Sequence, residues 1–265
     1  MKGLQIGADP EFFLKKNGMF HSGVGLVPGD KANPSPVDKG AVQVDGMAVE
    51  FNITPASTRR EFRHNIATVM ASLRDMIPPE YDFSFESVAQ FEEEHMASMP
   101  AEALVLGCDP DFNGYTETYN EEIADPGTVR VAGGHVHLGW GENFDPKDPN
   151  HFATCCRVAR QLDFTLGILG TMHDPKDVER KKMYGKPASF RPKSYGMEYR
   201  SLSSFWLETE ELMGQVYSGA HFAFDNLKAG NEFFVKFGNA AKDVMNSGSR
   251  HEAVNLYDAV YYGDF

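Results

Sequence analysis

Alternating apolar and polar positions predict strands in the first half of the chain. The segment GLQIGADPEFFLKK alternates and then reaches Asn17-Gly18, so we expect a strand over about residues 3–15 and a return strand after the turn. Residues 21–40 are rich in Gly, Pro, Asp and Lys and predict a long loop. AVQVDGMAVEFN then gives two short alternating runs around Asp45-Gly46, which is a strong hairpin signal.

Helical spacing begins after this hairpin. Thr58 and Glu61 form a capping box, and two prolines at 78 and 79 end the helix. Its core face is predicted to be Phe62, Ile66, Val69, Leu73 and Met76. A second helix is predicted over residues 149–170, with a core face of Phe152, Cys156, Ala159, Leu162 and Leu166.

Further strands and a helical end complete the pattern. DFSFESV reads as a strand, TVRVAGGHVHLGW as one long strand, and SYGMEYRSLSSFW as a final strand that runs into a turn. Beyond about residue 207 the pattern is helical. Strands that precede a helical C-terminal third predict an α+β fold with an antiparallel or mixed sheet. We interpret residues 1–265 as one domain, with a core over about 3–207 and a helical part over about 208–265.

Charge and cysteine content narrow the function classes. The formal net charge of −13 argues against direct nucleic-acid binding and fits a carboxylate-rich site for divalent cations. Cys108, Cys155 and Cys156 are odd in number and imply no disulfide framework. The N-terminal stretch has no apolar signal core, and no run approaches the ~20 apolar residues of a membrane span. We therefore expect a soluble, cytoplasmic protein without a membrane partner.

Acidic residues occupy matching faces of the first strands. Residues two apart share a face, which places Asp9 with Glu11 across Pro10, and a proline in a strand indicates an edge or a bulge. Glu50 shares a face with Asn52. A solvated edge or face is the alternative interpretation for each. The pattern Gly-x-Asp-Pro-acid-Phe in GADPEFF recurs in GCDPDFN, where Asp111 is the acid.

Two histidines share a face in AGGHVHLG. His135 and His137 lie with Gly133 and Gly139 on one side, while Val136 and Leu138 point the other way, into a core. One histidine in a strand is usually structural. Two at this spacing, flanked by glycines, favour metal or phosphate binding.

The last predicted strand adds opposite charges. Glu198 and Arg200 share a face; they could pair with each other, or Glu198 could hold a cation while Arg200 binds phosphate oxygens. Arg191 and Lys193, just upstream, are further candidates for binding anions. Asp163 lies near the core face of its helix. Because a buried unpaired aspartate is costly, we expect it to pair with Arg160 or with a site residue.

The ligand types suggest a hard divalent cation. Carboxylates with some imidazole suit Mg²⁺ or Mn²⁺, whereas zinc sites usually show closed sets of His or Cys. The sequence has no GxxxxGK[ST], GxGxxG, GxSxG or HExxH motif, which argues against the P-loop and nucleophile-elbow classes. ATP, if bound, must be held by metals and arginines.

These motifs together resemble a known family. GADPEF, VEFN, GCDPDFN, AGGHVHLG and YGMEYRSLSSFW are similar to the phage-encoded carboxylate–amine ligases, or type 2 amidoligases, over roughly residues 5–210. That family is related to glutamine synthetase and glutamate–cysteine ligase. The resemblance implies a glutamine-synthetase-like sheet with helices packed on one face. The strands of that sheet form a funnel for ATP and two or three divalent ions.

The resemblance also implies roles for individual residues. Metal ligands would be Glu11, Glu50, His137 and Glu198. The nucleotide would contact Arg200, Lys193, Arg191 and His135. Arg200 would be catalytic by stabilising the transferred group, and Asp9 and Asp111 are candidates for the catalytic acid that takes the proton of the amine. The family pattern leaves open which histidine binds metal. It also leaves open whether Asp9, shorter than the glutamate of many relatives, touches it.

The implied reaction has two steps. A small-molecule or peptide carboxylate attacks the γ-phosphate of ATP, and an amine then displaces phosphate from the acyl phosphate. The loop at 21–40 would close over the site and exclude water. A phage-encoded enzyme of this kind would work in the host cytoplasm, and a homo-oligomer is compatible with the sequence.

Two other functions stay open on the sequence alone. A metal-dependent hydrolase could use the His-x-His pair, although in barrel hydrolases that pair usually ends the first strand. A non-catalytic ligand-binding protein could keep the ligase fold.

Overall fold

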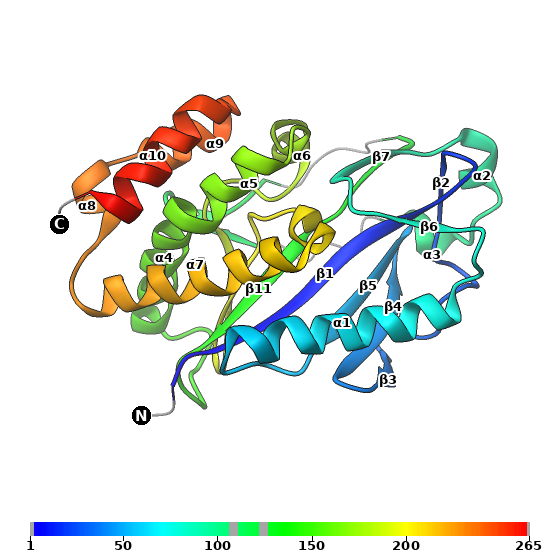
Figure 1. Cartoon of the computed structure of the whole chain (residues 1–265), viewed down its shortest axis with the longest axis horizontal. Helices are drawn as coiled ribbons and strands as arrows, with labels where there is room; N and C mark the ends of the chain where they lie inside the picture. Colours follow the sequence, from blue (N-terminus) through cyan, green and yellow to red (C-terminus); the bar gives the residue numbers. More distant parts are fainter. Residues whose placement is uncertain (1–2, 106–110, 122–126, 264–265) are drawn as a thin grey trace.

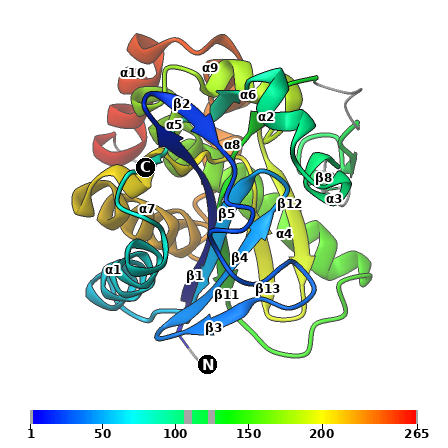
Figure 2. The ribbon, with the colours of Figure 1, turned by 90° about the vertical axis from the view of Figure 1, so that its right-hand side faces the viewer.

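The protein is built on a large antiparallel sheet (Figures 1 and 2). The computed structural model describes residues 3–105, 111–121 and 127–263; Cys108 and most of the GCDPDFN motif lie outside the described residues. Along the sheet the strands are β3 (Ser35–Val37), β4 (Gly40–Asp45), β5 (Ala48–Ile53), β1 (Gln5–Lys16), β11 (Gly134–Gly139), β13 (Gly196–Tyr199), β12 (Ser189–Lys193), β8 (Phe112–Asn113) and β9 (Thr118–Tyr119). The predicted α+β class with an antiparallel sheet is confirmed.

Four short strands complete the β structure. β2 (Met19–His21) and β6 (Asp82–Ser84) also pair with β1, while β7 (Val88–Gln90) and β10 (Val129–Val131) form a separate two-stranded sheet. The expected return strand after Asn17-Gly18 is β2, and the hairpin signal at Asp45-Gly46 marks the turn between β4 and β5. The expected loop at 21–40 contains β3.

Three long helices cover one face of the sheet. They are α1 (Arg59–Met76), α4 (Pro149–Leu162) and α7 (Glu210–Lys228), and α7 packs against both of the others. The opposite polar face of the sheet carries the candidate site. The buried core between sheet and helices includes Phe12, Leu138, Met197, Phe62 and Trp206.

The shorter helices gather at the two ends of the molecule. α5 (Ile168–His173) and α6 (Asp177–Met183) lead towards the C-terminal group of α8 (Phe233–Phe237), α9 (Ala240–Ser247) and α10 (Arg250–Tyr262). α2 (Glu93–Ala97) and α3 (Ala101–Leu104) lie at the opposite end (Figure 1). The predicted helical end of the chain is thus confirmed. In the described ranges, no helix combines the length and apolarity that a bilayer crossing needs.

The first long helix begins as the sequence predicts and ends differently. The Thr58 side chain accepts a hydrogen bond from the Glu61 amide, which caps α1. Met76, expected in the core, is 37% exposed, and Ile77 is buried in its place. The helix ends at Met76, so the extended backbone at Ile77 turns that side chain inward.

The expected long strand around the double glycine is wrong. It divides into β10, which pairs with β7, and β11, which pairs with β1 and β13. The division occurs at Gly133, which forms two hydrogen bonds with Glu11 beyond the last regular pair of β1 and β11. The Gly133 amide donates to Glu11 Oε2 at 2.8 Å, and the Glu11 amide donates to the Gly133 carbonyl at 2.8 Å. Pro10, which has no N–H to donate, is the last β1 residue in register with β11.

The second predicted helix continues through a π-helical turn. Residues Asp163–Gly167 form the turn η1 between α4 and α5. Asp163 has a partner, as expected, but of the two alternatives Arg160 is wrong, because Arg160 donates to the Gly114 carbonyl instead. Asp163 Oδ1 accepts from the Tyr199 hydroxyl at 2.6 Å and from the Ala188 amide at 3.0 Å. The π-helical turn therefore ties α4 to β13.

Candidate active site

The polar face of the sheet brings the predicted residues into one row. Glu50 on β5 lies opposite Glu11 on β1, Asp9 lies opposite His135 on β11, and Glu198 on β13 lies between His137 and Arg191. Directly opposed residues of an antiparallel pair point to the same face. Val136, Leu138 and Tyr199 point the other way and are fully buried, as the alternation predicts.

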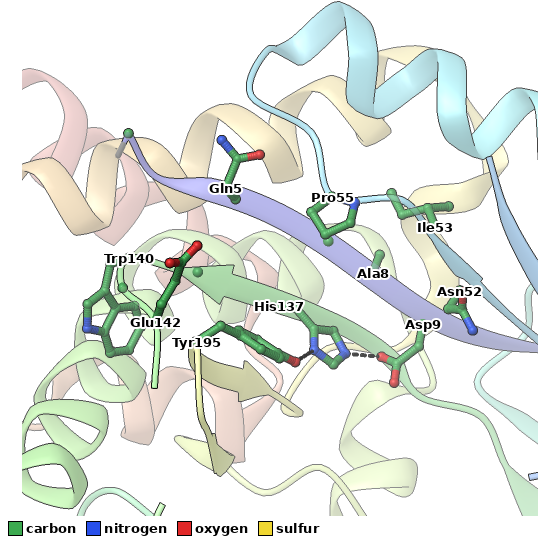
Figure 3. A pocket seen from close by; sticks show the side chains of 14 residues that line it. Gln5, Ala8, Asp9, Asn52, Ile53, Pro55, His137, Trp140, Glu142 and Tyr195 are labelled. Atoms are coloured by element: carbon green, nitrogen blue, oxygen red, sulfur yellow. Dashed lines mark hydrogen bonds and ion pairs between the residues drawn. The ribbon is translucent and has the colours of Figure 1, made fainter. Parts of the chain in front are cut away.

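Asp9, His137 and Glu198 form the first potential cation site. One ligand atom from each lies within 4.8 Å of the other two. Asp9 Oδ1 is 2.8 Å from His137 Nε2, and His137 Nδ1 is 2.5 Å from the Tyr195 hydroxyl (Figure 3). Burial alone would raise the pKa of Asp9, but the charges and hydrogen bonds of the two histidines outweigh it and hold that pKa well below its usual range.

His135, two residues before His137 on β11, faces the same two carboxylates, Asp9 and Glu198. Its Nδ1 lies 3.5 Å from Asp9 Oδ1 and 3.6 Å from Glu198 Oε1. Its Nε2 lies 2.9 Å from the Tyr184 hydroxyl, which also accepts a hydrogen bond from Arg200. Each histidine therefore turns one nitrogen to the carboxylates and the other to a tyrosine.

Glu11, Asp45 and Glu50 form a second potential cation site beside the first. Their ligand atoms also lie within 4.8 Å of one another. Burial raises the pKa of Glu50 well above its ordinary value, and the charges of Asp9, Glu11 and Asp45 raise it further. Burial also raises the pKa of Glu11. Three crowded carboxylates are a suitable environment for a positive ligand.

Basic side chains occupy the other end of the row. Glu198, which is 1% exposed, contacts Arg200, lies 2.8 Å from Lys193 Nζ and lies 3.9 Å from an Arg191 nitrogen. Arg200 Nε is 3.4 Å from Asp111 Oδ2, so the structure also brings Asp111 to the site. The row thus passes from acids on β4, β5 and β1, through two histidines, to cations on β12 and to Arg200, which directly follows β13.

A cavity of about 820 Å³ opens beside the first cation site. It extends along the first residues of β1 past Gln5 and Gly7 to Asp9, with Asn52, Pro55 and Trp140 on its sides (Figure 3). Its volume lies within the range of small-molecule pockets. At the other end of the site face, a small apolar cluster that includes Phe13, Phe91 and Met96 covers the sheet.

Three residues of the site were missed by the sequence analysis. Asp45 was interpreted only as a turn residue. Tyr184 follows the end of α6, and Tyr195 lies between β12 and β13. Neither tyrosine has a periodic position that would mark it. The strand β12 was also missed, although its cations were identified.

A family model describes the second half of this site. Residues 128–243 match the model of the family called phage phiEco32-like COOH.NH2 ligase-type 2. The match spans His135, His137, Glu198 and Arg200, while the acids of β1, β4 and β5 lie before it. No curated protein matches the chain.

Proposed function

We propose that the protein is an ATP-dependent carboxylate–amine ligase, because residues 128–243 match the model of the phage phiEco32-like COOH.NH2 ligase-type 2 family. The proposed reaction is Mg²⁺-dependent and passes through an acyl phosphate. The observation that carries the proposal is the row of charges on the site face. Two groups of carboxylates, one with a histidine, lie beside three cationic side chains. Such a row fits a metal-bound polyphosphate.

The side chains present fit divalent cations. Asp9, His137 and Glu198 would hold one ion, and Glu11, Asp45 and Glu50 a second. Both sets are dominated by oxygen, which Mg²⁺ prefers. Burial and the neighbouring carboxylates raise the pKa of Glu50, so a bound cation would favour its charged form. Bound Mg²⁺ would neutralise phosphate charge and polarise phosphoryl oxygens.

The cavity beside the first group is the proposed nucleotide site. A base and ribose held between β1 and Trp140 would direct the phosphates towards Asp9 and His137. Arg200, Arg191 and Lys193 lie next along the row, where they would contact the transferred phosphoryl group. Preorganised cations at that position stabilise the charge that develops during transfer.

The residues then support two displacements. A substrate carboxylate oxygen bonds to the γ-phosphorus, the bond from that phosphorus to the β–γ bridging oxygen breaks, and ADP leaves. The amine nitrogen bonds to the acyl carbon, phosphate leaves, and the amine proton passes to a carboxylate. Asp111, held beside Arg200, is the proposed acceptor of that proton. Because its pKa is lowered by the histidines, Asp9 fits cation binding better than proton transfer.

The proposal is tested by ADP formation. Panels of carboxylates and amines are screened with ATP and Mg²⁺, and turnover is expected only when both substrates and Mg²⁺ are present. Glu50→Gln and Arg200→Ala should each abolish turnover, and circular dichroism checks that both remain folded. Glu94→Gln, an exposed substitution on α2, is the control. Failure of a non-hydrolysable ATP analogue to bind with Mg²⁺ in calorimetry would contradict the proposal.

A further inference from the structure

A second cavity lies on the outer side of β12, away from the proposed nucleotide site. Its volume is about 570 Å³. β8 pairs with β12 only at Ser189 and Phe190, so the remainder of that edge has no neighbouring strand among the described residues. Pro192 lies on this edge and has no N–H to donate, which disfavours the addition of a peptide strand there.

Rings and cations line this second cavity. Phe112 stacks on Tyr119 with ring centroids 4.2 Å apart, and Phe152 meets Phe112 edge-on at 4.8 Å. Tyr119 is 61% exposed, so most of its ring is accessible. The basic lining residues are Lys147, Arg191 and Lys193. Of the residues that the structure describes, no Asp or Glu lines the cavity.

The lining selects a particular ligand chemistry. Three cations without a lining acid are unusual on a chain of net charge −13, and they favour an anion over an amine. Exposed aromatic rings favour a flat partner that can stack, and a cation beside a ring adds to that preference. The fitting ligand is therefore an organic anion that carries a planar ring.

Two of the cations connect this cavity to the candidate active site. Lys193 Nζ lies 2.8 Å from Glu198 Oε2, and an Arg191 nitrogen lies 3.9 Å from Glu198 Oε1. A ligand held by these side chains would place its charged end beside the row of site residues. The cations would repel the amine substrate, and the nucleotide is assigned to the first cavity, so the carboxylate substrate is the remaining occupant.

We propose that this second cavity binds the ring-bearing end of the carboxylate substrate, which is an aromatic or similarly planar organic anion. The inference rests on the proposed function, because it identifies the anion as the carboxylate substrate of that reaction. It assigns Tyr119 and Lys147, both outside the row of site residues, to substrate recognition.

Phenyl phosphate serves as the binding probe in calorimetry at neutral pH. It should bind about tenfold more tightly than inorganic phosphate, benzyl alcohol or benzylamine, because only it offers both ring and negative charge. Equal binding of inorganic phosphate would overturn the aromatic part of the inference. Tighter binding of benzylamine would overturn the anionic part.

Two exposed variants locate the probe. Tyr119→Ser and Lys147→Gln should each weaken phenyl phosphate binding about three- to tenfold. Tyr262→Ser on α10 and Lys228→Gln at the end of α7 are matched controls and should leave it unchanged. Undiminished binding in both cavity variants would refute the site.

A non-hydrolysable ATP analogue with Mg²⁺ separates this inference from the proposed function. The analogue should bind wild type and both cavity variants equally, because Tyr119 and Lys147 lie outside the proposed nucleotide site. Weaker binding of the analogue in both variants would assign the cavity to the nucleotide and overturn the inference. If the analogue fails to bind wild type while phenyl phosphate still depends on Tyr119 and Lys147, the ligase proposal fails. The cavity would then stand as an anion site without a substrate role.

Discussion

The Tyr199 hydroxyl donates to Asp163 Oδ1 at 2.6 Å, directly behind the strand that presents Glu198 and Arg200 to the site. Both partners are fully buried, and the same carboxylate oxygen accepts from the Ala188 amide, where β12 begins. One side chain in a π-helical turn therefore fixes β13, which Arg200 follows, and the start of β12, which carries Arg191 and Lys193.

Removal of this acceptor should destabilise the protein. Asp163→Ala removes the acceptor of the buried Tyr199 hydroxyl and of the Ala188 amide, which should lower the free energy of unfolding by roughly 2–5 kcal/mol. Asp163→Asn keeps an oxygen for both donors and should cost much less. Urea denaturation of the two variants measures the difference. Equal losses would show that the hydrogen bonds to Oδ1 contribute little.

The same aspartate should make stability depend on pH. Burial raises the pKa of Asp163 from its ordinary value of 3.8 to about 6. The folded state therefore retains a proton that the unfolded state has lost, and this contribution to stability is lost as pH rises from about 4 to about 6. The stability of wild type relative to Asp163→Asn should fall by about 2 kcal/mol across that window. A constant difference, measured by urea denaturation at each pH, would contradict the shift.

The two histidines should respond differently when their tyrosine partners are changed. Tyr195→Phe removes the hydroxyl beside His137 Nδ1, so Mg²⁺ affinity should fall about 10- to 100-fold. Tyr184→Phe frees His135 and Arg200, so ADP formation should slow by a similar factor while Mg²⁺ affinity stays unchanged. Calorimetry with Mg²⁺ and an ADP assay measure the pair. The reverse result would make His135 the metal ligand.

Mg²⁺ should stabilise the fold through the crowded carboxylates. At about 100 times its Kd, Mg²⁺ should add about 2.7 kcal/mol to the free energy of unfolding. Glu50→Gln removes one negative charge from the buried group, so it should raise stability without Mg²⁺ and reduce the gain on adding it. Thermal unfolding with and without MgCl₂ provides the measurement, with Glu94→Gln as the control. An unreduced gain in Glu50→Gln would place the stabilising ion elsewhere.

Substitution by alanine should reduce activity at Gly133 and stability at Gly134. A Cβ at Gly134 would collide with the Ser203 backbone carbonyl, which cannot move easily, so Gly134→Ala should lower Tm sharply. A Cβ at Gly133 would meet the His135 ring, which can turn away. Gly133→Ala should therefore fold and lose activity. Thermal unfolding and the ADP assay distinguish the two, and similar behaviour of both variants would contradict this account.

Strand alternation was sufficient to predict the site face. Asp9, Glu11, Glu50, His137 and Glu198 all lie on regular strands, where residues two apart share a side. The side of each strand on which these residues lie could therefore be predicted without knowing which strands are neighbours. The helical C-terminal part followed from apolar spacing in the same way.

Features that depend on distant residues could not be predicted. The break at Gly133 requires the backbone and side chain of Glu11, and the partner of Asp163 is a tyrosine on a later strand. Asp45 was interpreted as a hairpin residue, so its role as a potential cation ligand was not predicted. Its carboxylate reaches Glu11 only when β4, β5 and β1 pair. These relations arise from tertiary packing, which local sequence patterns do not encode.

Before any ligand binds, the basic side chains of the site neutralise the carboxylate of Glu198. Arg200, Lys193 and Arg191 surround this carboxylate, which is also a potential cation ligand. When a cation binds Glu198, the three basic side chains become available to bind phosphate. When phosphate binds those side chains, Glu198 becomes available to bind a cation. Cation and nucleotide should therefore bind with positive cooperativity, each raising the affinity for the other by the same factor, as linkage requires.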